Sequence, residues 1–315
     1  MSSLIAVDLG GTNLRVALFT RDQPPAAELI KIPTLASEGP DVVIARMIEA
    51  IHSILPKKKR GLRIGVGSPG PLDPFDGVIL DTPNMPGWKN IPLCARLSEH
   101  FSCPVMLEND ANLAALGEWR HGAAQGTQNL IYLTISTGIG GGVIVDGKLL
   151  RGARGLAGEL GHMTVERNGP ECGCGQRGHL EAIAAGPAIA RKVLERIETG
   201  ESSILTEMVH DEEPLTAAYV GRAARMKDRL AMEVVSEAGR HIGRHLASLV
   251  HAFNPEMIVL GGGVSRIGHP FFNAIEQALH EHVIHPMYVE DLPLVPAKLG
   301  DEAGLIGAMV MVSQA

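Results

Sequence analysis

The sequence predicts an α/β protein that contains an internal duplication. Three observations support this prediction: apolar strands alternate with helical patterns, a strand–glycine turn–strand unit occurs twice, and the composition is that of a globular chain. Hydrophobic residues occupy 45% of the 315 positions and charged residues 20%, which argues against a disordered or fibrous protein. A chain of this length forms two domains or one large α/β unit.

The first strand–glycine turn–strand unit opens the chain. Residues 4–7 form an apolar run that leads into Asp8, Gly10 and Gly11, and apolar side chains then alternate along residues 14–18. Alternation over such a short run is typical of a strand, and the glycines supply a tight turn. We expect two adjacent strands joined by this turn.

A helix, two more strands and another helix are expected before the second unit. A helical pattern begins at Asp41 and ends at Pro56, since proline cannot continue a helix. Apolar runs at residues 62–66 and 105–107 predict strands, and residues 111–119 have helical spacing. Strands that alternate with helices in this way are typical of the α/β class.

The second unit lies in the middle of the chain. Strands are predicted at residues 130–135 and 143–145, with a glycine turn at residues 136–142 between them. Asp146 and Gly147 fit a type I′ hairpin, which needs positive φ at both central positions. The elements expected after it are a loop rich in Gly, His and Cys at 152–178, helices up to residue 190, a long helix at 228–253, strands at 257–260 and 294–297, and a final helix to residue 312 that Asp301 caps.

Charge and hydropathy exclude several classes of partner. The formal net charge of -7 opposes non-specific binding to nucleic acid or anionic membranes, and 3% aromatic residues leave little for base stacking. The basic run at residues 57–60 fits a solvated linker. No uncharged apolar stretch reaches the roughly 18 residues of a membrane span, and the first residues lack a signal-peptide pattern. We predict a cytoplasmic protein without a membrane or nucleic-acid partner.

The two glycine turns are candidate phosphate sites. Glycine leaves backbone N–H groups uncovered, as close approach of phosphate oxygens requires, although a glycine turn can equally be a plain hairpin. Asp8, at the end of the first strand, could hold hydrated Mg²⁺. Two other nucleotide motifs fail: Val143 breaks the G-x-G-x-x-G pattern that starts at Gly138, and Leu149 replaces the Ser or Thr of a Walker motif.

Five blocks of sequence resemble one known family. They are Asp8-Leu-Gly-Gly-Thr-Asn-Leu-Arg15, Glu108-Asn-Asp-Ala-Asn112, Ser136-Thr-Gly-Ile-Gly-Gly-Gly142, Gly158-Glu-Leu-Gly-His162 and Cys172-Gly-Cys-Gly-Gln-Arg-Gly-His-Leu-Glu181. In this order they resemble ROK-family sugar kinases, most closely the bacterial glucokinases of that family, and the resemblance covers nearly the whole chain. It implies an actin-like, ribonuclease-H-like duplicated α/β fold with two lobes and a central cleft. Residues 1–115 with 300–315 would form the small lobe, and residues 116–299 the large lobe.

The resemblance gives the acidic residue of the second block the role of general base. Asp110 would accept the proton of the sugar hydroxyl during transfer of the γ-phosphoryl group, a reaction in which positioning matters more than strong basicity. The residue pattern alone leaves an alternative open. Asp110 stands between a predicted strand and a predicted helix, where Asp is also a common N-cap.

By the same resemblance, other polar residues and glycines bind the two substrates. The sugar residues are Asn84, Asn109, Glu159, His162 and Glu181, together with Asp110, since carboxylates and amides can each form two hydrogen bonds to hydroxyls. The nucleotide residues are Asp8, Gly10, Gly11, Thr12, Asn13, Thr137 and Gly138 around the phosphates, and Gly261, Gly262 and Gly263 near the adenosine. Glu159 and His162 would face the same way only if the turn between them is helical.

The last block also predicts a structural zinc site. The family pattern places zinc on a histidine and three cysteines, and here His179 stands where the third cysteine is expected. His162, Cys172, Cys174 and His179 still offer four ligands that tetrahedral Zn²⁺ accepts. The alternative is an empty loop with free thiols.

We therefore expect an ATP- and Mg²⁺-dependent enzyme that phosphorylates glucose at its 6-hydroxyl and, according to the resemblance, forms a homodimer. A kinase for another sugar, such as N-acetylmannosamine, mannose or fructose, stays open, because spacing does not reveal how hydroxyl stereochemistry is recognised. A sugar-sensing repressor is a further alternative. Regulators of this family carry a helix-turn-helix domain before the first glycine motif, where this sequence has seven residues before Asp8.

Overall fold

The computed structural model describes residues 3–56, 61–82, 85–209 and 214–314 and contains two five-stranded sheets with the same strand arrangement. The first sheet runs in the order β3 (Glu28–Pro33), β2 (Asn13–Phe19), β1 (Leu4–Leu9), β4 (Arg63–Ser68) and β8 (Val105–Asn109). The second runs in the order β11 (Lys148–Leu149), β10 (Ile139–Val145), β9 (Leu130–Ile135), β12 (Met257–Gly261) and β13 (Leu294–Pro296). In each sheet, three antiparallel strands are followed by two that run parallel to the third. The predicted duplication is confirmed.

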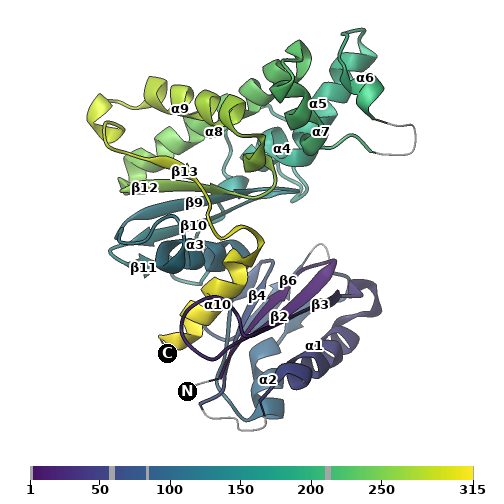
Figure 1. Cartoon of the computed structure of the whole chain (residues 1–315), viewed down its shortest axis with the longest axis vertical. Coiled ribbons are helices and arrows are strands. Elements are labelled where there is room, and N and C mark those ends of the chain that lie inside the picture. The colour runs from purple at the N-terminus through teal and green to yellow at the C-terminus, as the bar shows by residue number, and fades with distance from the viewer. Residues whose placement is uncertain (1–2, 57–60, 83–84, 210–213, 315) are drawn as a thin grey trace.

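The molecule has two lobes, and each consists of one sheet covered by helices (Figure 1). The small lobe is built on the first sheet and the large lobe on the second. The small lobe holds α1 (Pro40–Ile54), α2 (Leu93–Phe101) and a three-stranded sheet of β5 (Leu72–Asp73), β6 (Val78–Asp81) and β7 (Lys89–Ile91). The large lobe holds α4 (Leu180–Ala184), α5 (Gly186–Glu198), α6 (Leu205–Met208), α7 (Ala217–Arg225), α8 (Arg229–Phe253) and α9 (His269–His282). Two helices, α3 (Asp110–His121) and α10 (Ala303–Ser313), lie between the lobes.

Alternate side chains of the central strands enter different cores. In β1, Ile5 and Val7 belong to the core with α1 and α2, whereas Leu4 and Ala6 belong to the core with α3 and α10. β9 shows the same alternation between the large-lobe helices and α3. Both faces of each sheet are therefore buried, which is why these strands read as nearly continuous apolar runs in the sequence.

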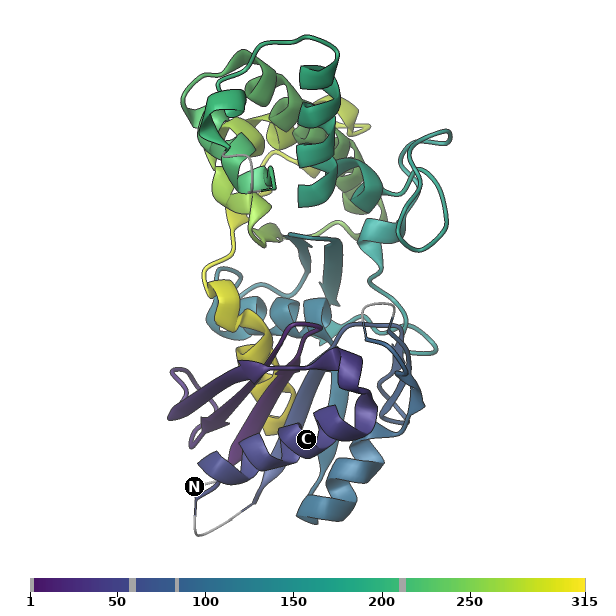
Figure 2. The same ribbon diagram turned by 90° about the vertical axis from the view of Figure 1, so that its right-hand side faces the viewer.

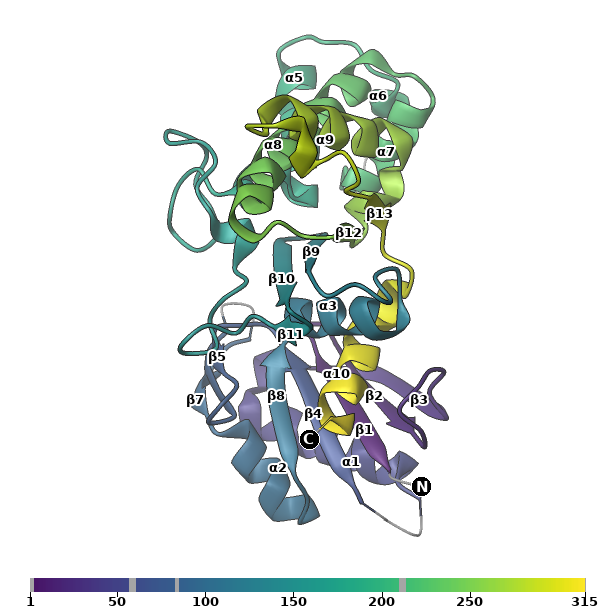
Figure 3. The same cartoon turned by 90° about the vertical axis from the view of Figure 1, so that its left-hand side faces the viewer.

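Helices α3 and α10 pack closely against each other, and Figures 2 and 3 show them between the two sheets from different sides. A Cβ atom on Gly117 of α3 would overlap the carbonyl oxygen of Ala303, and one on Gly307 of α10 would overlap that of Leu113. Only glycine permits this approach. Because α3 contacts strands of both sheets, the predicted assignment of residues 1–115 and 300–315 to the small lobe stays a prediction.

The structure also differs from the predicted elements. β3 is an edge strand with mostly exposed side chains, so it lacks the apolar alternation that marks a buried strand. β10 begins at Ile139, before the predicted strand. The capping role predicted for Asp301 is wrong, since Glu302 precedes the last helix and the Asp301 carboxylate pairs with Arg266. The type I′ hairpin is confirmed, with φ of 50° at Asp146 and 69° at Gly147. Among the described residues, no helix is long and apolar enough to cross a membrane.

Candidate active site

The predicted base lies where β8 meets α3. Asn109 is the N-cap of this helix, because its side-chain oxygen accepts hydrogen bonds from the N–H groups of Ala111 and Asn112 at 2.9 and 3.2 Å. Asp110 is the first residue of the helix, and its Oδ1 accepts from the Ala111 N–H at 2.8 Å. Since Asn109 caps the helix, capping does not require Asp110.

Asp110 lines a cleft of about 450 Å³ between the two lobes. The walls come from the first hairpin, the start of α3, the strand ends of the large lobe and the segment that leads into α10. The predicted residues that share this cavity are Asp8, Gly10, Asp110, Gly261, Gly262 and Gly263. The structure thus brings the predicted base, part of the first glycine turn and Gly261–Gly263 to one place, whereas of the second turn Ser136 lines the cavity and Thr137 and Gly138 do not.

The surroundings raise the pKa of Asp110 to about 7. Loss of water around the carboxylate is the largest cause, and the negative charges of Asp8 and Glu159 add to it, whereas the Ala111 N–H group acts in the opposite direction. The Asp110 side chain is exposed and lines the cleft, whose walls come from both lobes. A carboxylate that exchanges its proton near neutral pH suits general base catalysis.

The first glycine turn forms a closed hairpin at one wall of the cleft. Gly10 donates its N–H to the carbonyl oxygen of Asn13 at 3.0 Å, and Gly11 and Thr12 complete the turn. Thr34 holds it from the side, because its hydroxyl donates to the Gly10 carbonyl at 2.6 Å and its N–H to the Thr12 carbonyl at 2.9 Å. The hairpin is therefore fixed before any ligand binds.

Two arginines that the sequence analysis did not select as site residues also line the cleft. Arg15 lies opposite Asp8 on β2 and donates from Nε and Nη2 to Asp8 Oδ2 at 2.7 and 2.6 Å. Its Nη1 donates to the carbonyl oxygen of Asp301 at 2.5 Å, while Arg266 of the large lobe pairs with the Asp301 carboxylate at 3.1 Å. Each lobe thus contributes a positively charged guanidinium group to the cleft. These groups can balance the charge of bound phosphates.

The second glycine turn is shorter than the predicted one. Ser136 donates its N–H to the Gly138 carbonyl at 2.8 Å, which closes a turn around Thr137. Gly140 and Gly142 belong to β10, and a Cβ atom on either would press against α3. These glycines serve helix packing, and only the first part of the block has the form of a turn.

Two predicted sugar residues point toward the same space. Asn109 Nδ2 and Glu159 Oε1 each lie 3.6 Å from the position that a Cβ atom on Gly70 would take. His162 donates its N–H to the Glu159 carbonyl at 3.1 Å, and residues Leu160–His162 form a 3₁₀ turn. The helical turn on which the shared orientation of Glu159 and His162 depends is therefore present.

Glu181 joins two parts of the site. Its Oε2 accepts from the N–H of Ile139, just after the second turn, at 2.9 Å. Its Oε1 lies 3.6 Å from Sγ of Cys172, so the same carboxylate touches the predicted metal site. Asn84, the remaining predicted sugar residue, lies outside the described residues.

His162, Cys172, Cys174 and His179 come together in space, each with a ligand atom within 4.8 Å of the others. Sγ of Cys172 lies 3.7 Å from Nδ1 of His162, and Sγ of Cys174 lies 3.3 Å from Nδ1 of His179. Ligand atoms on a shared tetrahedral zinc ion lie roughly 3.4–3.8 Å apart. The donor atoms are of the types that zinc accepts, and these two separations are close to that range.

A buried ion pair behind the predicted base was missed by the sequence analysis. Glu108 is fully buried, and its Oε1 accepts from the Asn109 N–H and from Asn112 Nδ2, both at 3.0 Å. Its Oε2 accepts from Nε of Arg151 at 2.6 Å. The available signal was a charged residue at the end of a buried strand, which is rare without a partner.

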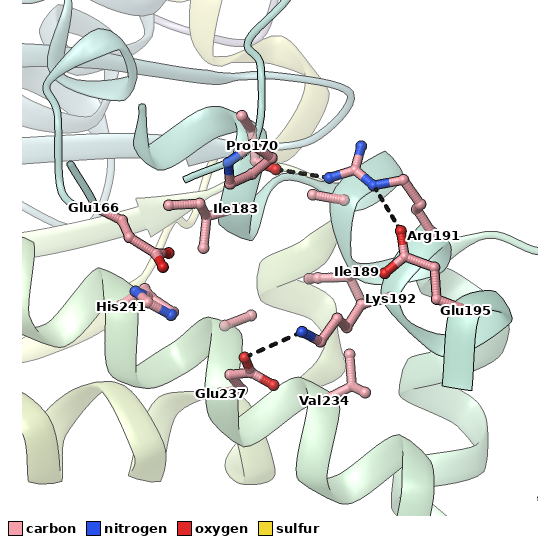
Figure 4. Close-up of a pocket in the computed structure, with 13 residues that line it drawn as sticks. Glu166, Pro170, Ile183, Ile189, Arg191, Lys192, Glu195, Val234, Glu237 and His241 are labelled. Carbon is pink, nitrogen blue, oxygen red and sulfur yellow. Dashed lines mark hydrogen bonds and ion pairs between the residues drawn. The ribbon is translucent and has the colours of Figure 1, made fainter. Parts of the chain in front are cut away.

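Another pocket, of about 160 Å³, lies within the large lobe (Figure 4). Apolar side chains from α4, α5 and α8 form its floor, and the ion pairs Lys192–Glu237 and Arg191–Glu195 lie at its rim. Glu166 and His241 lie next to each other at one side of it. None of the predicted site residues lines this pocket, so the interlobe cleft is the candidate active site.

A duplicated fold with two turns and a carboxylate around an interlobe cleft defines the class of proteins with the actin-like ATPase fold. Within that class, this chain belongs to the ROK family, whose model matches residues 4–315. It is similar to the glucokinase of Thermotoga maritima, with 37% identity over 99% of this chain and 97% of the relative. A putative xylose repressor of a Caldicellulosiruptor species is 32% identical over 84% of this chain and 65% of the repressor.

A solved structure has the same fold over its full length. The ROK family glucokinase of Streptomyces griseus, in complex with glucose and AMPPNP, matches with a TM-score of 0.84 and 30% identity. The match covers 100% of both chains. The expected fold is therefore confirmed.

Proposed function

We propose that this protein is a glucokinase that transfers the γ-phosphoryl group of ATP to the 6-hydroxyl of glucose. The observation that carries the proposal is Asp110, a carboxylate with a pKa of about 7 in the cleft between two lobes. The similarity to the Thermotoga glucokinase and to the Streptomyces enzyme in complex with glucose and AMPPNP supports these two substrates.

In this proposal, Asp110 accepts the hydroxyl proton as the sugar oxygen bonds to the γ-phosphorus and ADP departs. Asn109 and Glu159 orient the sugar from the side of Gly70, and His162, Glu181 and Asn84 complete its binding site. Movement of the lobes toward each other would exclude water, which otherwise competes with glucose for the phosphoryl group.

The opposite side of the cleft binds ATP. The Gly10 N–H closes the first turn, so the N–H groups of residues 11–13 and 137–138 hold the phosphates. Arg15 and Arg266 balance their charge. Gly261, Gly262 and Gly263 line the cleft where the adenosine would bind, and a Cβ position on Gly263 has open space around it. Mg²⁺ bound with ATP would neutralise the phosphate oxygens, and Asp8 is the residue that would hold it through water.

We further propose that the Cys and His cluster holds structural zinc, which would brace the loop that leads into α4, the helix that carries Glu181. Protein purified without chelators should contain one zinc ion per chain by mass spectrometry. His179→Ala should lose most of it, whereas His179→Cys, a matched control that restores the third cysteine, should retain it. A wild-type protein with less than about a tenth of an equivalent of zinc would contradict the proposed site.

A sugar panel tests the proposed substrate. The purified protein is supplied with ATP, Mg²⁺ and glucose, mannose, fructose or N-acetylmannosamine, and release of ADP is measured. We expect the highest kcat/KM with glucose. A higher value with another sugar would show a kinase of different specificity. Absence of turnover with all of them, together with sugar-dependent DNA binding, would favour the regulator alternative instead.

The assembly and location of the enzyme are further parts of the proposal. A homodimer follows from the resemblance, and light scattering of the purified protein measures it. None of the four cysteines forms a disulfide in the described part of the chain, which suits the reducing cytoplasm, where ATP is also available.

A further inference from the structure

The ion pair of Glu108 and Arg151 connects two parts of the site that come from distant segments. Glu108 is fully buried, so its charge needs a partner to remain ionised inside the protein. One of its oxygens holds the junction of β8 and α3, at the Asn109 N–H and the Asn112 side chain. The other holds Arg151, which is 43 residues away in the sequence.

Arg151 begins the loop that leads to Glu159. Its carbonyl oxygen accepts from the N–H of Ala157 at 3.1 Å, so the loop folds back on its own start. A Cβ atom on Gly155 would overlap the Pro74 ring, which shows how closely the loop passes the β5–β6 turn of the small lobe. Figure 3 shows the segment after β11 beside β5.

The end of the loop is fixed as well. A Cβ atom on Gly158 would lie 3.2 Å from Oδ1 of Asn112, the same side chain whose Nδ2 donates to Glu108. Glu159 follows directly, and its Oε1 shares the space beside Gly70 with Asn109. Glu108 thus contacts Asn109 directly and reaches Glu159 through Arg151 and the loop.

We propose that Arg151 is a positioning residue, which through Glu108 aligns Glu159 with Asn109 and Asp110 around the sugar. This inference rests on the proposed function and adds a residue to it. Arg151 itself touches no reacting atom in this account. Because the nucleotide turns and Gly261–Gly263 belong to other elements, loss of Arg151 should disturb the sugar side of the cleft and spare the ATP side.

Arg151→Met keeps the length of the side chain and removes its charge. Its KM for glucose and its glucose dissociation constant, measured by calorimetry without ATP, should rise between about tenfold and a hundredfold, since small misplacements of binding groups have effects of this size. The KM for ATP should stay within about twofold of wild type. Arg151→Lys, which keeps a cation beside Glu108, should recover most of the glucose affinity.

Two further variants separate positioning from stability. Arg151→Met leaves a buried charge without its partner, so the double variant Glu108→Gln/Arg151→Met should restore the melting temperature. Its glucose affinity should stay low, because the side-chain contact between Glu108 and the start of the loop is still missing. Arg196→Met removes a cation bound to Glu201 and Glu233, far along the large lobe, and should leave the glucose affinity unchanged.

Three results would overturn the role of Arg151. They are an Arg151→Met variant with wild-type glucose affinity, a double variant whose glucose affinity returns with its stability, or an equal loss of affinity for glucose and ATP. The wild-type protein is assayed in parallel. If it phosphorylates no glucose and binds none, the proposed function itself fails, and that result is distinguishable from all three.

Discussion

At the scale of single residues, the proposed chemistry depends on the surroundings of one carboxylate, that of Asp110. The position of Asp110 at a strand-to-helix junction could be predicted from the sequence pattern, but that pattern left a helix cap as an alternative. The structure gives the cap to Asn109. The raised pKa of Asp110 could not be predicted, because it depends first on loss of water around the carboxylate and then on the charges of Asp8 and Glu159, and all three arise only in the folded chain.

The pKa of Asp110 predicts the pH dependence of activity. A general base must be ionised, so kcat/KM for glucose should rise about tenfold per pH unit below pH 7 and level off above it. The measurement is kcat/KM between pH 5 and pH 9 at constant ionic strength. A profile that stays flat down to pH 5 would contradict the assignment of Asp110 as the base.

Asp8→Asn should shift this profile to lower pH. The negative charge of Asp8 raises the pKa of Asp110, and its removal makes the ionised form of Asp110 easier to reach. The midpoint of the acidic limb should move down even though overall activity also falls, since Asp8 faces the phosphates in our proposal. An unchanged midpoint would mean that Asp8 does not act electrostatically on the base.

At the scale of elements, the strands that could be predicted best from the sequence are those with both faces buried. β1, β9 and β12 could be identified from apolar runs, and the two turns from their glycines. The edge strand β3 exposes most of its side chains and gave no such pattern. The second glycine block combines two functions, a turn and a strand packed on α3, which glycine content alone does not distinguish.

The contact of α3 with α10 offers a stability test with a matched control. Gly307→Ala would place a methyl group on the backbone of Leu113 and should destabilise the protein by about 3 kcal/mol, because a packed interface cannot move aside easily. Gly304→Ala lies in the same helix with open space around it, and should be neutral or stabilising by about 1 kcal/mol.

Chemical denaturation measures both variants. Equal stabilities of Gly307→Ala and Gly304→Ala would show that the helices are not packed as described. A selective loss in the first variant would confirm that the two lobes depend on this contact.

At the scale of the whole molecule, the duplication was visible in the sequence as two similar units, and the structure repeats it in the order of strands in both sheets. The cleft was not visible in this way. Its walls come from the first hairpin, the start of α3 and the segment before α10, which are brought together only by the packing of the two lobes. The Glu108 and Arg151 pair shows the same limit, since nothing in the sequence connects these two positions.

The site should also lower the stability of the whole protein. The pKa of Asp110 is raised in the fold, from 3.8 to about 7, so the folded protein retains a proton that the unfolded chain loses between these values. The resulting penalty is absent below about pH 4, grows as the pH rises, and is complete above pH 7. Asp110→Asn removes it.

Asp110→Asn should therefore stabilise the protein more at pH 8 than at pH 5. We expect a difference of about 1 kcal/mol, after discounting the pKa shift for the water that reaches the cleft. Urea denaturation of both proteins at the two pH values measures this difference. The same gain at both values would show that ionisation of Asp110 does not oppose folding.

The most direct test of the account compares Asp110→Ala with the wild-type enzyme in two measurements on the same preparation. They are kcat for glucose phosphorylation and the glucose dissociation constant from calorimetry. We predict that kcat falls by about 10²–10⁴ while the dissociation constant changes by less than about threefold, since a general base acts mainly in the transition state. A variant that retains wild-type kcat would contradict the central claim that Asp110 accepts the proton.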